Sequence, residues 1–195
     1  MKKSLFVFIT IIISSCEQSE VAKIENVDAY ADIPVGAERI AYTDKPGLER
    51  VVQKGTEGDV LQAGDYLNGQ RHGYWIEYYP NGTVKLMANY FNGKLHGAYL
   101  SIDNRGNITE NAIFNNGLKN GLFKRFERGR VVEEVSYSND IIHGPVKKFY
   151  ANGNVQEQSN YTNGVLDGEA KWYDQQGNVT IEYTYQNGEL VDQGN

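Results

Sequence analysis

Three histidines occupy equivalent positions of an internal repeat and are the first candidates for metal ligands. His72, His96 and His143 each precede a glycine, and Asn120 and Asp167 take the same place in two further copies. One metal ion needs every ligand atom at about 2 Å. Neighbouring members of this series should lie roughly 10 Å apart, two strand spacings. The sequence therefore predicts polar residues that stabilise turns, and no metal site.

Catalytic chemistry has no candidate among the other side chains. Carboxylates are abundant, but the sequence contains no nucleophile motif, no phosphate-binding loop and no Cys/His cluster, and no carboxylate pair is marked by its spacing. The chain carries 25 Asp and Glu against 19 Lys and Arg, a formal charge of −6, which disfavours nucleic acid as a partner. We expect neither an enzyme nor a bound cofactor.

Aromatic side chains are the remaining candidates for a binding surface. Tyr is frequent, at 14 of 195 residues, and Trp75, Tyr79, Tyr99 and Trp172 lie in the aromatic-rich runs of the repeat. Exposed rings at these positions would form a stripe that binds a glycan or a peptide. The alternative is that the rings form the core of a thin sheet. Trp75, Tyr78 and Tyr79 belong to one unit. Because successive side chains point to opposite faces of a strand, these three rings lie on both faces and at least one must be exposed.

The N-terminus carries a targeting segment. Residues 1–15 combine two lysines with an apolar run that is too short to span a membrane, and end in two serines. Cys16 follows as the only cysteine, and its context resembles a bacterial lipobox, which implies cleavage before Cys16 and lipidation of that residue. The alternative is an ordinary signal peptide with an incidental cysteine. Residues 16–41 are polar and acidic without a sustained period of 2 or 3.6, and we interpret them as a tether.

A lipid anchor of this type predicts a location in the cell envelope. Several acyl chains on one residue anchor a protein firmly, because each buried CH₂ contributes ~0.8 kcal/mol. The acidic residues 17–20 resemble surface-export signals of some Gram-negative lipoproteins. We expect an outer-membrane lipoprotein that is either periplasmic or surface-exposed, and the sequence leaves the leaflet open.

An internal repeat organises the rest of the chain. Residues at the same place in successive copies, here called a column, recur at steps of 24, 24, 23, 24 and 24 residues. Two columns of glycine and one of Val or Ile keep these steps, and the leading column is aromatic: Tyr66, Tyr90, Phe114, Tyr137, Tyr161 and Tyr185. Degenerate copies at both ends are typical of the capping units of repeat arrays. We assign residues 42–195 to this array.

Each unit contains two turn signals and two short runs rich in aromatic and β-branched residues. Residues 80–82 (Pro-Asn-Gly) represent the hairpin turns, and residues 68–73 (Asn-Gly-x-x-x-Gly) a longer connection to the next hairpin. Apolar residues of the upstream run are three apart, as Trp75 and Tyr78 are, which predicts a bulge. Single hairpins are unstable alone. The predicted fold is all-β, an elongated single twisted antiparallel sheet of tandem hairpins.

With these columns and the signature Tyr-x-Asn-Gly, residues 55–195 resemble the MORN repeat variant of bacteria, which is typical of proteins named as YwqK-family antitoxins. Arg128 replaces Asn in one turn and Asp140 replaces Gly in one connection, so turn geometry is expected to differ there. The resemblance implies a scaffold that binds proteins or lipids. We expect a membrane-anchored module for protein interaction or self-association. The alternatives are a glycan-binding lipoprotein and, from the family name alone, an antitoxin-like inhibitor.

Overall fold

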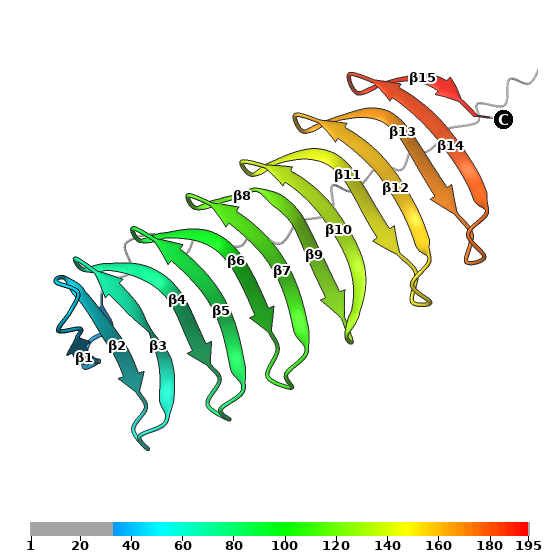
Figure 1. Ribbon diagram of the computed structural model, residues 1–195. Coiled ribbons are helices and arrows are strands. Elements are labelled where there is room, and N and C mark those ends of the chain that lie inside the picture. The colour runs from blue at the N-terminus through cyan, green and yellow to red at the C-terminus, as the bar shows by residue number, and fades with distance from the viewer. Residues whose placement is uncertain (1–32, 195) are drawn as a thin grey trace, which may run out of the picture.

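The computed structural model describes residues 33–194, which form a single open antiparallel sheet. The strands pair in sequence order, apart from the two-residue β8, which pairs with β7 beside the main path. Figure 1 shows curved hairpins that advance along one axis and give an elongated molecule. The predicted all-β array is confirmed. The strands are β1 Glu38–Ala41, β2 Leu48–Lys54, β3 Val60–Leu67, β4 Gln70–Tyr78, β5 Val84–Phe91, β6 Lys94–Ile102, β7 Ile108–Asn115, β8 Leu118–Lys119, β9 Gly121–Glu127, β10 Arg130–Ser138, β11 Ile141–Phe149, β12 Val155–Thr162, β13 Val165–Tyr173, β14 Val179–Gln186 and β15 Glu189–Gln193.

The sheet begins inside the stretch that the sequence assigned to a tether. β1 pairs with β2 over all four of its residues, and the Arg39 guanidinium donates two hydrogen bonds of 2.7 Å to the Glu49 carboxylate. This ion pair is solvent-exposed and contributes little, so the backbone ladder is what holds β1. Residues from Glu38 onward belong to the array. Cys16 and the earlier part of 16–41 lie outside the described residues, and no helix within 33–194 could cross a membrane.

The tightest turns are the ones that the sequence suggested as longer connections. Asn68 and Gly69 have φ values of 51° and 81°, and the residues that flank them pair directly. Two residues with positive φ form the type I′ turn that suits twisted hairpins. The other signal, residues 80–82, sits in a longer loop that the Tyr79 amide closes by donating to the Thr83 carbonyl at 2.8 Å. The order of the two turn types was therefore predicted wrongly.

The predicted bulge is present, but on the partner strand. Glu77 pairs with Leu86 and Tyr78 with Val84, which leaves Lys85 as an extra residue on β5. Equivalent shifts occur in the β6–β7, β11–β12 and β13–β14 hairpins. The extra residue re-aims the strand end and increases its local twist, which explains why the apolar residues of the upstream strand are three apart.

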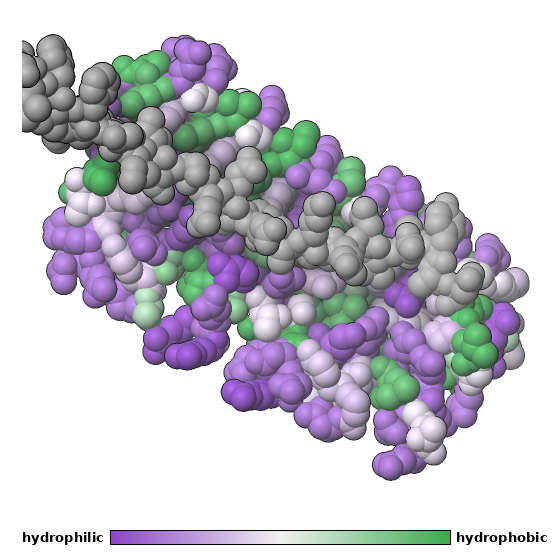
Figure 2. All heavy atoms as spheres, turned by 180° about the vertical axis from the view of Figure 1, so that it is seen from behind, coloured by the Kyte–Doolittle hydropathy of each residue, from purple (hydrophilic) through white to green (hydrophobic). Residues whose placement is uncertain are grey.

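One face of the sheet holds the core. Side chains that touch across the strands alternate in size: Trp75 lies opposite Gly64 and Ala88, whereas Ala170 lies opposite Tyr183. Alternating large and small residues fill space densely from β3 to β9, whereas farther along the array Ser159 lies between Val146 and Ala170. Seen from the opposite side to Figure 1, hydrophobic residues occur along the whole array between hydrophilic ones (Figure 2). The buried cluster comprises Val51, Tyr66, Trp75, Leu86, Ala88, Tyr90, Leu95, Ala112, Phe114, Phe123, Val135 and Tyr137.

A one-residue deletion gives the β9–β10 hairpin a strained turn. Arg128 and Gly129 have φ values of 52° and 75°, so the deletion converts the longer loop into a two-residue turn with arginine in the left-handed region. That region costs an ordinary L-residue about 1–2 kcal/mol and suits Asn better. Arg128→Asn should raise the free energy of unfolding by about 0.5–1 kcal/mol in urea titrations.

Arg105 provides the matched control for this substitution. It stands in the same column, one residue before Gly106, and is absent from the residues of positive φ. Arg105→Asn should change the free energy of unfolding by less than about 0.5 kcal/mol. An equal gain from both substitutions would mean that charge, and not backbone strain, accounts for the effect.

Candidate binding surface

The aromatic residues selected from the sequence do not form one exposed stripe. Trp75 is only 1% exposed and belongs to the core, where its ring meets that of Tyr66 edge-on at 5.7 Å. Tyr99 is half-buried and packs edge-on against Phe114 at 5.5 Å, and burial raises the pKa of its hydroxyl to about 12. The exposed-stripe interpretation is therefore corrected for Trp75, and the core alternative describes it.

The other two candidates make contacts within the array. The half-buried Tyr79 donates a hydrogen bond of 3.0 Å from its hydroxyl to the Ile102 carbonyl, 23 residues further on. Trp172 is half-buried and meets Tyr183 edge-on at 5.7 Å. Tyr79 thus joins successive hairpins and Trp172 packs within the β13–β14 hairpin, so the first role of both side chains is structural.

A register shift decides which ring of the β4 strand is exposed. Gly64 pairs with Trp75, whereas the next residue, Asp65, pairs with His72. Two residues of β4 are therefore unpaired with β3, and Trp75 points to the core while Tyr74 points away from it. Tyr74 is 72% exposed. The exposed ring of this unit is therefore Tyr74, and not one of the three rings among which the sequence predicted it; of those, Tyr78 and Tyr79 are half-buried.

The face opposite the core, here called the outer face, carries an apolar surface over β4 to β9. Neighbouring side chains on it follow the ladder, since Ile76 pairs with Met87 and Met87 with Leu100, and paired residues point to the same side. Met87 and Ile113 are 41% and 43% exposed. We call this set the outer patch: Tyr74, Ile76, Met87, Leu100, Ile113 and Leu122.

The outer face also carries a row of paired side chains that is charged from β9 onward. Lys124, Glu134 and Lys147 pair across β9, β10 and β11, and Lys171 pairs with Glu182 across β13 and β14. The Lys124 ammonium lies 2.7 Å from the Glu134 carboxylate, and the Lys171 ammonium 3.2 Å from that of Glu182. The outer face is thus divided into an apolar N-terminal half and a charged C-terminal half.

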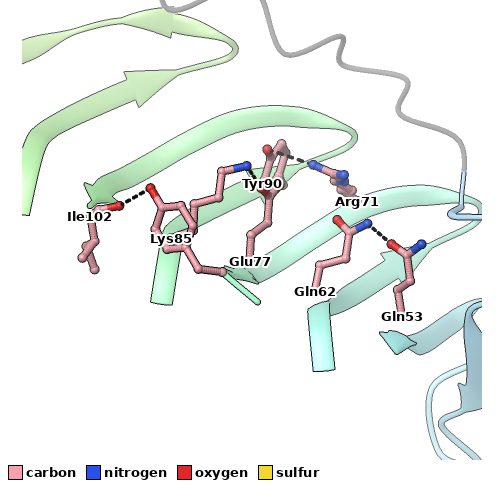
Figure 3. A network of polar contacts seen from close by, with 8 residues as sticks. Gln53, Gln62, Arg71, Glu77, Lys85, Tyr90 and Ile102 are labelled. Carbon is pink, nitrogen blue, oxygen red and sulfur yellow. Dashed lines mark hydrogen bonds and ion pairs between the residues drawn. The ribbon is translucent and has the colours of Figure 1, made fainter. Parts of the chain in front are cut away.

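The core face contains a cation held between aromatic rings. The Arg71 guanidinium lies 4.2 Å from the Trp75 ring centre and 5.3 Å from that of Tyr90, and donates to the Tyr90 hydroxyl at 3.2 Å (Figure 3). Burial raises the pKa of Tyr90, and the nearby positive charge of Arg71 opposes that rise. Contacts of a cation with two ring faces are favourable where water is excluded.

Lys119 repeats this arrangement two units later in the same column. Its ammonium lies 5.2 Å from the Phe123 ring centre and 4.9 Å from that of Tyr137. Burial lowers the pKa of Lys119, while Asp140 and Glu110 act in the opposite direction. These cations were missed from the sequence. A signal was present, because the other members of the column, such as Leu95, are aliphatic.

Two members of the histidine column, His143 and Asp167, stabilise turns, whereas the buried Nδ1 of His72 has no hydrogen-bond partner within residues 33–194. The described part of the chain brings together no group of three His, Cys, Asp or Glu that could hold a metal ion. The His143 Nδ1 accepts a hydrogen bond of 3.4 Å from the Asn163 amide, and the Asp167 carboxylate accepts one of 3.3 Å from the Asn187 amide. Each acceptor thus fixes the left-handed Asn of the next turn, as predicted for this column.

Comparisons with known proteins agree with the repeat structure. Residues 71–94, 142–163 and 166–187 match the family model described as MORN repeat variant. No curated protein matches the chain. Among solved structures, a mutant TarM of S. aureus in complex with Fondaparinux, alpha-GlcNAc-glycerol and UDP aligns with 85% of this chain at 12% identity and a TM-score of 0.31.

The chain spans 22% of the length of that TarM structure, and a likeness this weak bears on neither fold nor function. The closer resemblance to YwqK-family proteins stays a prediction. The three matched segments begin in β4, β11 and β13, each in a strand of the same repeating hairpin sheet. The body of this chain is therefore an array of MORN-variant repeats.

Proposed function

We propose that the chain is a non-catalytic interaction scaffold, held in the cell envelope by a lipid on Cys16, whose outer patch binds a protein partner. The outer patch carries the proposal: Tyr74, Met87 and Ile113, on β4, β5 and β7 of one face, are exposed by 72%, 41% and 43%. Contiguous exposed apolar surface of this kind marks interaction sites. The family match supports a repeat scaffold for interactions.

The chemistry of the outer face favours a protein over a glycan. Tyr74 is flanked by the aliphatic Ile76 and Met87, and the charged row from Lys124 to Glu182 adjoins this apolar area. An apolar centre with a charged margin is the composition of a protein interface. A glycan stripe would need Trp75 at the surface, and that ring is in the core.

Capture from detergent-solubilised envelope tests the outer patch. The wild-type chain should recover a stoichiometric partner, and Met87→Asp should lower that recovery at least tenfold, because it places a charge in the apolar contact. Gln158→Asp is the matched control, since Gln158 lies in the same row but in the charged half. Recovery of the chain alone as a monomer, or equal recovery by both variants, contradicts the proposal. A product of two copies identifies self-association as the interaction.

The anchor is tested separately. Cys16→Ala, or inhibition of the lipoprotein signal peptidase, should move the chain from the membrane to the soluble fraction, because the acyl chains provide the membrane affinity. The fractions are compared by immunoblot. Unchanged membrane retention in Cys16→Ala would contradict the lipid anchor without bearing on the outer patch.

A further inference from the structure

We infer that the acidic segment 17–32 of this chain binds along the core face and places carboxylates beside Arg71 and Lys119. The core face is opposite to the outer patch, so the inference stands apart from the proposed function. Four observations support it: a buried cation without an anion, a sheet of a single layer, the spacing of apolar residues in the segment, and its charge.

The first observation is the environment of Arg71. The residue is 8% exposed, and its Nε is buried without a hydrogen-bond acceptor. Within residues 33–194 no carboxylate forms an ion pair with Arg71, whose polar contacts are the hydroxyls of Tyr66 and Tyr90. A buried charge is costly unless it is paired. The site therefore lacks one component, a carboxylate.

The second observation is the sheet itself. The described strands form one layer, whereas an apolar sheet face is stable when another layer covers it. Ile33 and Ala37, at the start of the described chain, already pack against the core cluster. The described chain therefore begins at the core face, and a segment that precedes Ile33 needs no long connection to reach it.

The third observation is a period of three in the segment. Val21, Ile24, Val27 and Tyr30 are three residues apart, and Ile33 continues the series. A polyproline II chain has three residues per turn and rises ~9.3 Å over them. The array advances by two strand spacings per unit, ~9.6 Å. An extended segment that crosses the strands would thus place one apolar side chain on each successive unit.

The fourth observation is charge. Residues 17–32 contain five acidic residues and one basic residue, Lys23. Arg71 and Lys119 stand two units apart in one column, which corresponds to ~19 Å, and six residues of a polyproline II chain span the same distance. The segment is long enough to reach both cations and carries the negative charge that Arg71 lacks.

Limited proteolysis of the purified full chain in detergent tests this inference. Trypsin cuts after Lys23, and a bound segment should be cut at least tenfold more slowly than the synthetic peptide 17–32. Arg71→Gln should accelerate the cut at least fivefold, and so should Asp28→Asn combined with Asp32→Asn, which leaves the sheet unchanged. A variant that combines Arg71→Gln with both aspartate substitutions should be cut little faster than either variant alone, because both changes remove the same contact. Mass spectrometry gives the rate at this one bond.

Three controls make the result specific. Arg105→Gln removes a cation from an exposed turn and should leave the rate unchanged, whereas Arg71→Lys keeps the charge and should keep most of the protection. Met87→Asp alters only the outer patch and should not change the cut after Lys23, so the two proposals fail separately. A wild-type rate equal to that of the peptide, or no acceleration in the Asp28 and Asp32 double variant, would overturn the inference.

Discussion

Trp75→Ala should lower the free energy of unfolding by about 3–5 kcal/mol, the cost of truncating a large buried aromatic residue. The ring is 1% exposed, meets Tyr66 edge-on and lies under the Arg71 guanidinium at 4.2 Å. Its loss leaves a cavity and removes one wall of the site that holds a buried cation. Urea titration followed by far-UV circular dichroism measures the change, because the fluorescence of the variant would report on Trp172 alone.

The adjacent Tyr74 is the control for this prediction. It is 72% exposed, and Tyr74→Ala should change the free energy of unfolding by less than about 0.5 kcal/mol. The same substitution should weaken partner capture through the outer patch. A similar loss of stability in both variants would show that the faces of β4 are assigned wrongly.

Gly64→Ala should destabilise the protein by about 2–3 kcal/mol, although it adds a single methyl group. A Cβ at Gly64 would overlap Cε3 of the Trp75 ring and lie 2.8 Å from Cδ2. Gly64 is absent from the residues of positive φ, so its backbone would accept alanine. Without the overlap the substitution would instead stabilise the strand by about 0.5–1 kcal/mol. The sign of the change in urea titrations therefore tests the packing directly.

A second substitution should reverse this loss. In the next unit the smaller ring of Tyr99 lies between Ala88 and Ala112, so alanine opposite tyrosine already occurs in this fold. Gly64→Ala combined with Trp75→Tyr should be more stable than Gly64→Ala alone. The effects of the two substitutions on the free energy of unfolding would then be strongly non-additive, as expected for residues in contact. A double variant that is less stable than either single variant would show that the ring is not the obstacle.

The repeat could be predicted from the sequence because one period governs many columns at once. Local geometry within the unit could not. Both turn signals contain Asn-Gly, and only the pairing of the residues on either side of Asn68 and Gly69 shows that these form the two-residue turn. The bulge was expected from the spacing of Trp75 and Tyr78, but a spacing on one strand does not reveal which strand holds the extra residue, here Lys85.

The binding surface was harder to predict than the fold. Trp75 and Tyr74 are neighbours, and strand alternation alone assigns them to opposite faces without saying which face is the core. The register shift between Gly64 and Asp65 settles that assignment, and it depends on pairing with another strand. Arg71 was missed because a charged residue in a repeat is ordinarily solvated. Its enclosure arises from rings that come from two different strands.

The two ends of the sheet determine how far the molecule extends. β1 and β15 have four and five residues, are exposed throughout and carry charged side chains such as Arg39 and Asp192. Short, charged edge strands discourage pairing with further chains, so the array ends where its last hairpin ends instead of growing into a fibre. Thirteen spacings between the strands of the main path correspond to ~60 Å. Binding sites along the described array are therefore spaced in increments of one hairpin.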